Sequence, residues 1–301
     1  MSKKRIIICG PTGIGKSGMA FELARYWNIP IISADSRQIF KYLNIGTAKP
    51  SIEILLKIKH YFIDECELDE SYSAGRFANE CRKVEEQLYQ KDDKILICGG
   101  TGFYLKAYLE GLDGLPKSEI STKEKIELLW KQNGIQALQE LLLALDPETY
   151  GTIDLQNPRR LSRALEICLT TGKSVTEAAS PKTTNTSTEP NTFSFYLNCD
   201  REELYTKINQ RTEQMIEEGL YSEFLKYKSY SNTQAMQTVG YKEWLEYENE
   251  NYSFDETVEK IKQHTRNYAK RQITWFNKFH QGKVIHPEDI QKVIDTVDID
   301  S

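Results

Sequence analysis

The sequence predicts an α/β fold: a P-loop-containing parallel sheet flanked by helices, with a helical insertion domain. Short apolar runs typical of buried strands alternate with segments of helical periodicity, which favours a parallel sheet. A glycine-rich loop joins the first of these strands to the first helix. Between residues 116 and 190 the alternation stops and helical patterns follow one another without a strand. We therefore expect a catalytic core formed by residues 1–115 and 191–301, with residues 116–190 inserted as a helical domain.

The elements expected from this pattern follow from β-branched runs and from apolar residues at helical spacing. The predicted strands are Lys4–Cys9, Ile29–Ser33, Tyr61–Asp64, Lys94–Cys98, Phe193–Cys199 and a last one near Lys283–His286. The predicted helices include Lys16–Trp27, Ser121–Asn133, Ile135–Leu145, Pro158–Thr171 and a long one near Phe254–His280. The tract Ser180–Thr192 is rich in Ser, Thr, Asn and Pro, which predicts an exposed loop.

The composition is that of an ordinary globular protein, with 39% hydrophobic and 28% charged residues in 301. No apolar run approaches the ~20 residues of a membrane span, and the N-terminus leads directly into the glycine-rich loop, so we expect a cytoplasmic protein without a membrane partner. Six dispersed cysteines without a C-x-x-C pair predict reduced thiols and no zinc site. The net charge is −5, so any nucleic acid must be held by a local basic patch.

The glycine-rich loop matches the phosphate-binding pattern G-x-x-x-x-G-K-[ST] through Gly10, Gly15, Lys16 and Ser17. Glycines let successive N–H groups face a phosphate, and the helix N-terminus and Lys16 add positive field. A turn that binds nothing is the weaker interpretation, because the full match stands between a strand and a helix. We expect Ser17 to be a ligand of Mg²⁺ and the loop to bind a diphosphate through Gly10, Pro11, Thr12, Gly13, Ile14, Gly15, Lys16 and Ser17.

Polar residues also follow two further predicted strands. Asp35 comes directly after Ile29–Ser33, and the sequence GGTGFY, with Thr101, follows Lys94–Cys98. Because the carboxyl ends of parallel strands meet at one edge of a sheet, these residues are expected near the phosphate-binding loop. Each signal alone is weak, since an Asp in a turn and a glycine pair at a strand end are common.

Eight short blocks, in order and at similar separations, resemble the tRNA dimethylallyltransferase family. The blocks are GPTGIGKS, DSRQIF, IGTAKP, GGTGFY, NPRRLSRALE, INQRTEQM, VGYKE and AKRQITWF. The resemblance implies transfer of a dimethylallyl group from dimethylallyl diphosphate to the exocyclic amine (N6) of the adenosine 3′ of the tRNA anticodon. The length, and the lack of the C-terminal zinc-finger segment of eukaryotic relatives, favour the bacterial type.

The resemblance also implies roles for individual residues. Asp35 corresponds to the base that accepts the proton of the amine, Thr101 to the threonine between this base and the diphosphate, and Arg211 to an arginine that contacts the phosphates. Without the resemblance, Arg211 would be taken for an exposed helix cation. Lys16 and Mg²⁺ would stabilise the charge of the departing diphosphate. His60 stands before Tyr61 where many family members have a His pair, so we expect His60 to be structural.

A target base in the anticodon arm has to leave its stack to reach such a site. In the insertion, Arg159 and Arg163 lie one helical turn apart and predict a basic face that contacts phosphates. The long C-terminal helix adds basic residues, while its aromatic residues are expected mostly in the core. We expect a monomer that contacts the tRNA anticodon arm through Asp35, Ser36, Arg37, Gln38, Thr101, Lys123, Arg159, Arg160, Leu161, Ser162, Arg163, Gly240, Tyr241, Lys242, Lys270, Arg271 and Gln272.

Two other functions share part of this pattern. An isopentenyltransferase that acts on free adenine nucleotides would have the same phosphate loop and base, but it would need no basic helical insertion. A P-loop metabolite kinase would need only the strand, loop and helix, and would leave the DSRQ and GGTG blocks unexplained.

Overall fold

The computed structural model describes residues 2–111, 119–179 and 190–299. The chain forms two compact units. The α/β unit comprises Met1–Leu109 and Thr186–Ser301, and the helical unit comprises Glu110–Asn185. Each unit is described by itself.

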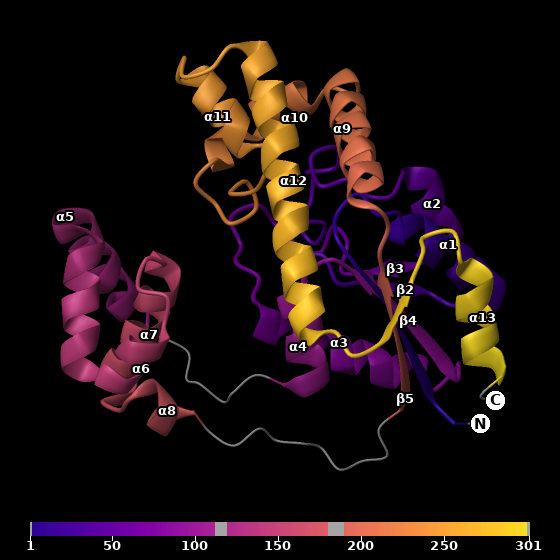
Figure 1. Cartoon of the computed structure of the whole chain (residues 1–301), viewed down its shortest axis with the longest axis horizontal. Coiled ribbons are helices and arrows are strands. Elements are labelled where there is room, and N and C mark those ends of the chain that lie inside the picture. The colour runs from indigo at the N-terminus through magenta and orange to yellow at the C-terminus, as the bar shows by residue number, and fades with distance from the viewer. Residues whose placement is uncertain (1, 112–118, 180–189, 300–301) are drawn as a thin grey trace. The chain divides into compact units, whose positions relative to one another are not determined.

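A six-stranded sheet forms the centre of the α/β unit (Figure 1). Its strands are β1 (Lys4–Cys9), β2 (Ile31–Ser33), β3 (His60–Tyr61), β4 (Lys94–Gly99), β5 (Asn191–Leu197) and β6 (Lys283–Ile285). Their order is β3-β2-β4-β1-β5-β6 and every pair is parallel. The predicted α/β class with a parallel sheet is confirmed. The order matters for the site, because β2, β4 and β1 are neighbours and their carboxyl ends meet.

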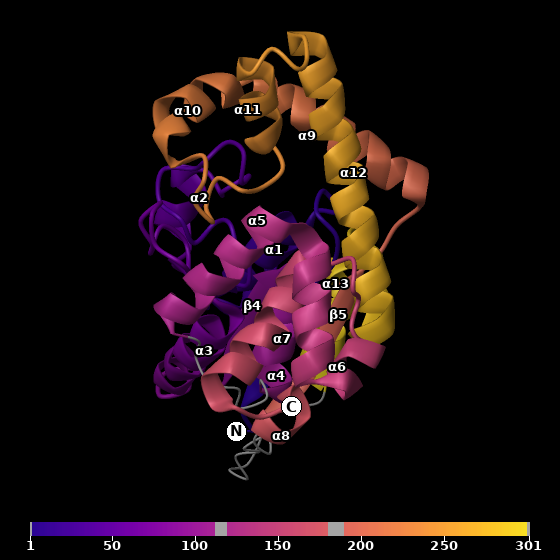
Figure 2. The same ribbon diagram turned by 90° about the vertical axis from the view of Figure 1, so that its left-hand side faces the viewer.

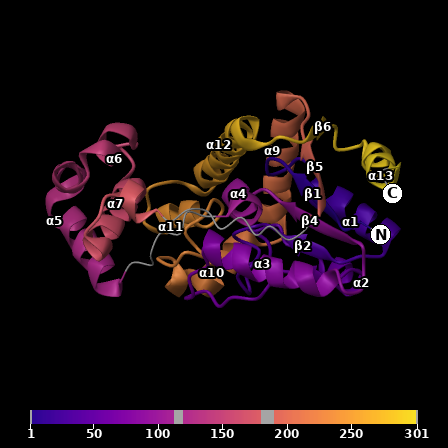
Figure 3. The same cartoon turned by 90° about the horizontal axis from the view of Figure 1, so that it is seen from below.

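Helices cover both faces of this sheet (Figure 3). Apolar residues of α1 and α13 pack with one face, and those of α3 and α4 pack with the other. The helices of this unit are α1 (Lys16–Trp27), α2 (Ile52–Lys57), α3 (Ala74–Leu88), α4 (Gly102–Glu110), α9 (Arg201–Glu217), α10 (Leu220–Tyr227), α11 (Lys242–Glu248), α12 (Phe254–Phe279) and α13 (Ile290–Ile299), with a 3₁₀ turn η1 at Lys228–Tyr230.

The long helix α12 connects the sheet with the α10–α11 region (Figure 1). A capping box starts it: the Ser253 side chain accepts from the N–H of Glu256, and the Glu256 carboxylate accepts from the N–H of Ser253. Near its other end Phe276 is buried against Tyr196 of β5, with 5.4 Å between ring centroids. The helix also lies against α9. Its side chains are therefore spread between this region and the edge of the sheet.

The helical unit contains α5 (Ile120–Leu145), α6 (Pro147–Thr152), α7 (Pro158–Thr171) and α8 (Val175–Ala178). Gly134 interrupts α5 with φ 74°, so two helical segments run in different directions (Figure 2). This break stands between the two helices predicted from the sequence. Asn157 caps α7 by accepting from the N–H of Arg160, and Pro158 occupies its first turn, which is typical of a helix start. Leu138, Leu142 and Leu161 belong to the core of this unit.

The boundaries of β2, β4 and β5 differ from the prediction by one or two residues, and those of β3 by up to three. The third strand is His60–Tyr61 instead of Tyr61–Asp64, because Phe62 and Asp64 adopt left-handed conformations, with φ 64° and 58°, that end the strand. The fifth strand begins at Asn191, so the last two residues of the predicted loop Ser180–Thr192 belong to the sheet. Residues 180–189 of that loop lie outside the described residues.

All six cysteines are free thiols, and five of them are buried. Among the residues that the structure describes, every helix is too short or too polar to cross a membrane.

Candidate active site

Three adjacent strand ends build the site. β1 ends at Cys9 and continues into the P-loop, Gly10–Ser17, while β2 is followed by Asp35 and β4 by Gly100. The N–H of Ala34 donates to the Cys98 carbonyl at 2.7 Å, which ties the end of β2 to that of β4. The sheet order therefore brings the phosphate loop and the carboxylate to one edge.

The P-loop has the backbone that its glycines permit. Gly10, Gly13 and Gly15 have φ values of 151°, 83° and 103°, which residues with a side chain rarely adopt. A Cβ on Gly13 would lie 2.7 Å from the side chain of Ile208, so close packing against α9 also requires glycine there. The Ile14 side chain is buried in the core, and Ile14 is not among the described residues that line the cavity.

Lys16, at the start of α1, carries the first cation of the site. Its Nζ donates to the carbonyl of Pro11 at 2.7 Å, within the P-loop. Burial lowers the pKa of the Lys16 ammonium, while Asp35 acts in the opposite direction. An anion bound at the loop would stabilise this ammonium.

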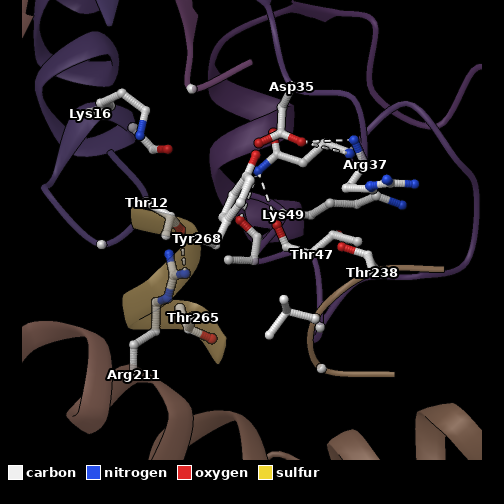
Figure 4. Close-up of a pocket in the computed structure, with 18 of the residues that line it drawn as sticks. Thr12, Lys16, Asp35, Arg37, Thr47, Lys49, Arg211, Thr238, Thr265 and Tyr268 are labelled. Atoms are coloured by element: carbon white, nitrogen blue, oxygen red, sulfur yellow. Dashed lines mark hydrogen bonds between the residues drawn. The ribbon is translucent and has the colours of Figure 1, made fainter. Parts of the chain in front are cut away.

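Arg211 supplies a second cation from α9. Its Nη2 donates to Thr12 Oγ1 of the P-loop at 2.7 Å, and Figure 4 shows this contact. Burial lowers the pKa of the guanidinium from its ordinary value, and the charge of Asp35 raises it. The arginine expected to be at the phosphates thus lies against the phosphate loop.

Asp35 lies at the start of a turn that fixes its carboxylate. Oδ1 accepts from the N–H of Arg37 at 2.8 Å and from that of Gln38 at 3.3 Å. Oδ2 makes no hydrogen bond within the described residues, and Asp35 lines the cavity. Thr101 accepts at Oγ1 from the N–H of Ser36 at 3.0 Å, so it holds the residue next to Asp35 but is not among the described residues that line the cavity.

The site opens into a cavity of about 980 Å³ whose lining belongs to the α/β unit. One wall is a face of α12 with residues at helical spacing, and Figure 4 shows Tyr268 of this face beside Asp35 and Thr12. The α12 residues at this wall are Ile261, His264, Thr265, Asn267, Tyr268, Arg271 and Gln272. Tyr268, Trp275 and Phe279 are partly buried and Phe276 is fully buried, whereas Phe254 is exposed.

The cavity includes residues to which the sequence analysis gave no role. Thr47 and Lys49 come from the IGTAKP block, and Thr238 comes from the turn before VGYKE. Lys49 Nζ donates to the carbonyl of Phe40 at 2.6 Å and pairs with Asp64. Their only signal in the sequence was membership of blocks, or of the segment beside a block, that resemble the family.

Histidines at the cavity are also held by the protein. His60 Nδ1 lies 2.8 Å from the Ile58 carbonyl, and burial lowers the pKa of His60, which fits the structural role expected for it. His264 Nδ1 lies 2.6 Å from Oε1 of the buried Glu243, and Oε2 of Glu243 accepts from the N–H of Gly240.

The site fits a magnesium ion that is bound mainly by the phosphates of a substrate. In the described part of the chain, no group of three or more His, Cys, Asp and Glu residues could hold a metal ion. Ser17 is exposed at the cavity beside Lys16 and offers a hydroxyl oxygen. Mg²⁺ prefers oxygen ligands and commonly uses substrate phosphates with few protein groups, so this donor set is compatible with it.

Five of the residues expected to contact RNA are buried, namely Gln38, Leu161, Gly240, Tyr241 and Gln272. Leu161 is 0% exposed in the core of the helical unit, because its position on α7 faces α5. Tyr241 is 1% exposed and its hydroxyl donates to Glu223. Gln272 is 7% exposed, and both ends of its amide bond to the protein backbone. The structure thus places the side chains of Leu161, Tyr241 and Gln272 in contacts within the protein, and their contacts with RNA remain predictions.

The Gln38 side chain is also engaged within the protein. Its amide accepts from Ser33 Oγ and donates to the carbonyls of Thr47 and Ala48 at 3.3 and 3.0 Å. It thus anchors the IGTAKP segment.

Other residues expected at the RNA lie at the surface or at the cavity, and their contacts remain predictions. Arg37 donates to the Gln234 carbonyl, and Arg163 pairs with Glu166 on α7. Lys123, Arg159, Arg160, Lys242, Lys270 and Arg271 are exposed, Ser162 and Arg163 are partly buried, and Ser36, Arg37, Gly240, Lys242 and Arg271 line the cavity.

Fold and site together define a P-loop α/β enzyme in which two partly buried cations and a carboxylate line one cavity. The chain belongs to the family described as IPP transferase, whose model matches residues 38–279. It is 40% identical to a tRNA dimethylallyltransferase of Cytophaga hutchinsonii over 97% of this chain and 96% of that protein. It is 41% identical to a tRNA dimethylallyltransferase of Chlorobium phaeobacteroides over 95% of this chain and 92% of that protein.

Two solved structures are similar to this chain. A tRNA isopentenylpyrophosphate transferase from Staphylococcus epidermidis is 29% identical, with a TM-score of 0.71, and the match covers 99% of this chain and 100% of that one. A eukaryotic dimethylallyltransferase acting on tRNA has a TM-score of 0.80 over 99% of this chain and 80% of that one; at 24% identity it supports the fold. The predicted family, with bacterial relatives, and the predicted enzyme class of prenyltransferase are confirmed.

Proposed function

We propose that this prenyltransferase moves a dimethylallyl group from dimethylallyl diphosphate to N6 of the adenosine 3′ of the anticodon in tRNA. The observation that carries the proposal is the juxtaposition of Asp35 with Lys16 and Arg211. The carboxylate acts on the pKa values of both cations, and all three line one cavity. The reaction needs a base for the amine and cations for the diphosphate, and the cavity contains both.

The leaving group would lie at the P-loop. The N–H groups of the loop, the Lys16 ammonium and the Arg211 guanidinium would bind the diphosphate and stabilise the charge that develops as its bond to the dimethylallyl carbon breaks. Mg²⁺ at the Ser17 hydroxyl would neutralise phosphate charge. The desolvation of both cations makes these interactions stronger than they would be in water.

The nucleophile, the adenine amine, would lie beside Asp35. The lone pair of the adenine amine is delocalised into the ring, so removal of its proton during attack assists the reaction. Oδ2 of Asp35 is available for this proton, because both N–H groups that hold the carboxylate bond to Oδ1. The new bond joins N6 to the dimethylallyl carbon, diphosphate departs and the amine proton passes to Asp35.

The nucleic acid would be an anticodon arm held by basic residues. We propose that the helical unit contacts it through the surface arginines of α7, and that the enzyme acts as a monomer in the cytoplasm, where its tRNA substrate would lie. The base would leave its stack and enter the cavity, as is general for enzymes that act on bases. The cavity volume of about 980 Å³ leaves room for an adenine beside a dimethylallyl diphosphate.

Incubation with labelled dimethylallyl diphosphate and either unmodified tRNA, AMP, or ATP plus metabolites tests the proposal. We expect label in tRNA alone, at the adenosine 3′ of the anticodon. Label in AMP would instead indicate an isopentenyltransferase of free nucleotides, and phosphorylation of a metabolite would indicate a kinase; either result would refute the proposal.

A further inference from the structure

Gln272 of α12 joins two of the strand-end loops that form the site. Its Oε1 accepts from the N–H of Thr12 in the P-loop at 2.8 Å. Its Nε2 donates to the carbonyl of Gly100, in the turn after β4, at 2.8 Å. The side chain is 7% exposed, so both polar ends are satisfied within the protein.

The packing around Gln272 is tight. A Cβ on Gly100 would lie 2.6 Å from Gln272 Nε2, 3.2 Å from the Gly10 carbonyl oxygen and 3.4 Å from Lys16 Nζ. Gly100 does not have a positive φ, so contact with Gln272 is the main obstacle to a side chain at this position. The amide of Gln272 thus fills the space that a Cβ on Gly100 would need, beside the Lys16 ammonium.

These contacts determine which loop groups can bind a ligand. The Thr12 N–H is used by Gln272, and the Thr12 hydroxyl accepts from Arg211. Within the described structure, the N–H groups of Gly13, Ile14 and Gly15 donate to no protein acceptor. Two helices far along the chain therefore hold Thr12, while the amides after it are left for phosphate oxygens.

We propose that Gln272 is a positioning residue for the diphosphate, which acts by holding Thr12 and Gly100 in register around the P-loop. This inference rests on the proposed function only in taking a diphosphate as the ligand of the loop. It assigns the glutamine of the AKRQITWF block to the leaving-group half of the site.

Isothermal titration with inorganic diphosphate and Mg²⁺ tests this role without the transfer reaction. Gln272→Met keeps the length of the side chain but removes both hydrogen bonds. We expect it to weaken diphosphate binding roughly tenfold, which corresponds to about 1.4 kcal/mol. The KM for dimethylallyl diphosphate should rise by a similar factor, while the Kd for tRNA and the Tm stay near wild type.

Gln263→Met is the matched control, because Gln263 is an exposed glutamine of the same helix and is not among the residues that line the cavity. It should bind diphosphate as wild type does. Unchanged diphosphate binding by Gln272→Met, or a loss of tRNA affinity alone, would overturn the inference. Wild-type protein that binds no diphosphate would instead overturn the proposed function.

A double-mutant cycle with Gly100→Ala provides a second test that does not depend on the stability of one variant. With Gln272 present, the new methyl group clashes with Nε2 and should weaken diphosphate binding. In the Gln272→Ala background the 2.6 Å clash is removed and the nearest remaining atom is the Gly10 carbonyl oxygen at 3.2 Å, so Gly100→Ala should add less further loss. Additive losses would show that the two residues act separately and would refute the assignment.

Discussion

The cations of the α/β unit and those of α7 in the helical unit differ in their surroundings. Lys16 and Arg211 are partly buried, desolvation lowers the pKa of each, and each donates to a P-loop oxygen. Arg160 lies exposed on α7, and Arg163, partly buried there, has an acidic partner one turn away. Buried charges interact strongly and depend on geometry, whereas exposed charges are screened by salt. The first pair is suited to a reacting diphosphate and the second to the backbone of a nucleic acid.

The largest expected effect is that of Asp35→Asn on the chemical step. The amide keeps the shape and an oxygen for the N–H groups of Arg37 and Gln38, but it cannot take a proton from the amine. Loss of a general base commonly costs ~10²–10⁴ in rate, and single-turnover kinetics at saturating tRNA should show a loss in this range with little change in tRNA affinity.

Asp93→Asn is the control for this change, because Asp93 precedes β4 at the opposite edge of the sheet and pairs with Lys94. It should leave the rate of transfer near wild type. An Asp35→Asn enzyme within threefold of wild type between pH 6 and 9 would exclude Asp35 as the base.

Next in size is the effect of Lys16→Ala on the diphosphate. Truncation of one partner of a buried charge pair costs ~2–5 kcal/mol, so the affinity for diphosphate should fall about 30-fold or more. Filter binding should show tRNA affinity close to wild type, since the loop binds the leaving group. Protection against thermal unfolding by ATP and not by dimethylallyl diphosphate, lost in Lys16→Ala, would favour a kinase instead.

The burial of Lys16 also predicts a pH dependence. Its pKa is lowered from the ordinary 10.5, so the ammonium that attracts diphosphate is lost at a lower pH than that of an exposed lysine. Wild-type affinity for diphosphate should therefore fall as the pH rises through this lowered pKa. Titrations at several pH values between 7 and 10 should show the wild-type advantage over Lys16→Ala shrinking with pH. A constant ratio would mean that Lys16 does not titrate in this range.

The sequence predicted those features that depend on local chemistry. The P-loop and α1 followed from glycine spacing and helical periodicity, and Gly134 stands where the two predicted helices of the insertion meet. The third strand was wrong in extent, because Phe62 has a left-handed backbone that its residue type rarely adopts, whereas an Asp such as Asp64 adopts it more readily. Such conformations are imposed by the surrounding structure.

A residue of the site was predictable where its residue type determines its chemistry, and less predictable where its role depends on whether its side chain is buried. Asp35 was placed from the end of its strand. Gln272 and Tyr241 looked like polar surface residues in the sequence, but their partners are distant in the chain: Gln272 bonds to Thr12 and Tyr241 to Glu223. Only the tertiary structure brings these partners together, so sequence pattern alone could not separate them from exposed neighbours such as Lys270 and Arg271.

The smallest expected effects are those of Arg160 and Arg163 on α7, and the effect differs between the two residues. Each phosphate contact that is lost makes the negative slope of log affinity against log salt less steep by ~0.7–0.9. Arg160 has no side-chain partner within the described residues, so Arg160→Ala should weaken tRNA binding and reduce the slope by about this amount. Arg163 already pairs with Glu166 at 3.2 Å, which offsets part of its charge, so Arg163→Ala should change the slope less.

Filter binding over a salt titration measures both effects. Lys131→Ala on α5, whose lysine pairs with Glu127, is a control that should leave the slope unchanged. Turnover at saturating tRNA should recover in both arginine variants. Unchanged affinity together with lost turnover would place these arginines in the chemistry or the folding of the helical unit and would remove the contrast between buried and exposed cations.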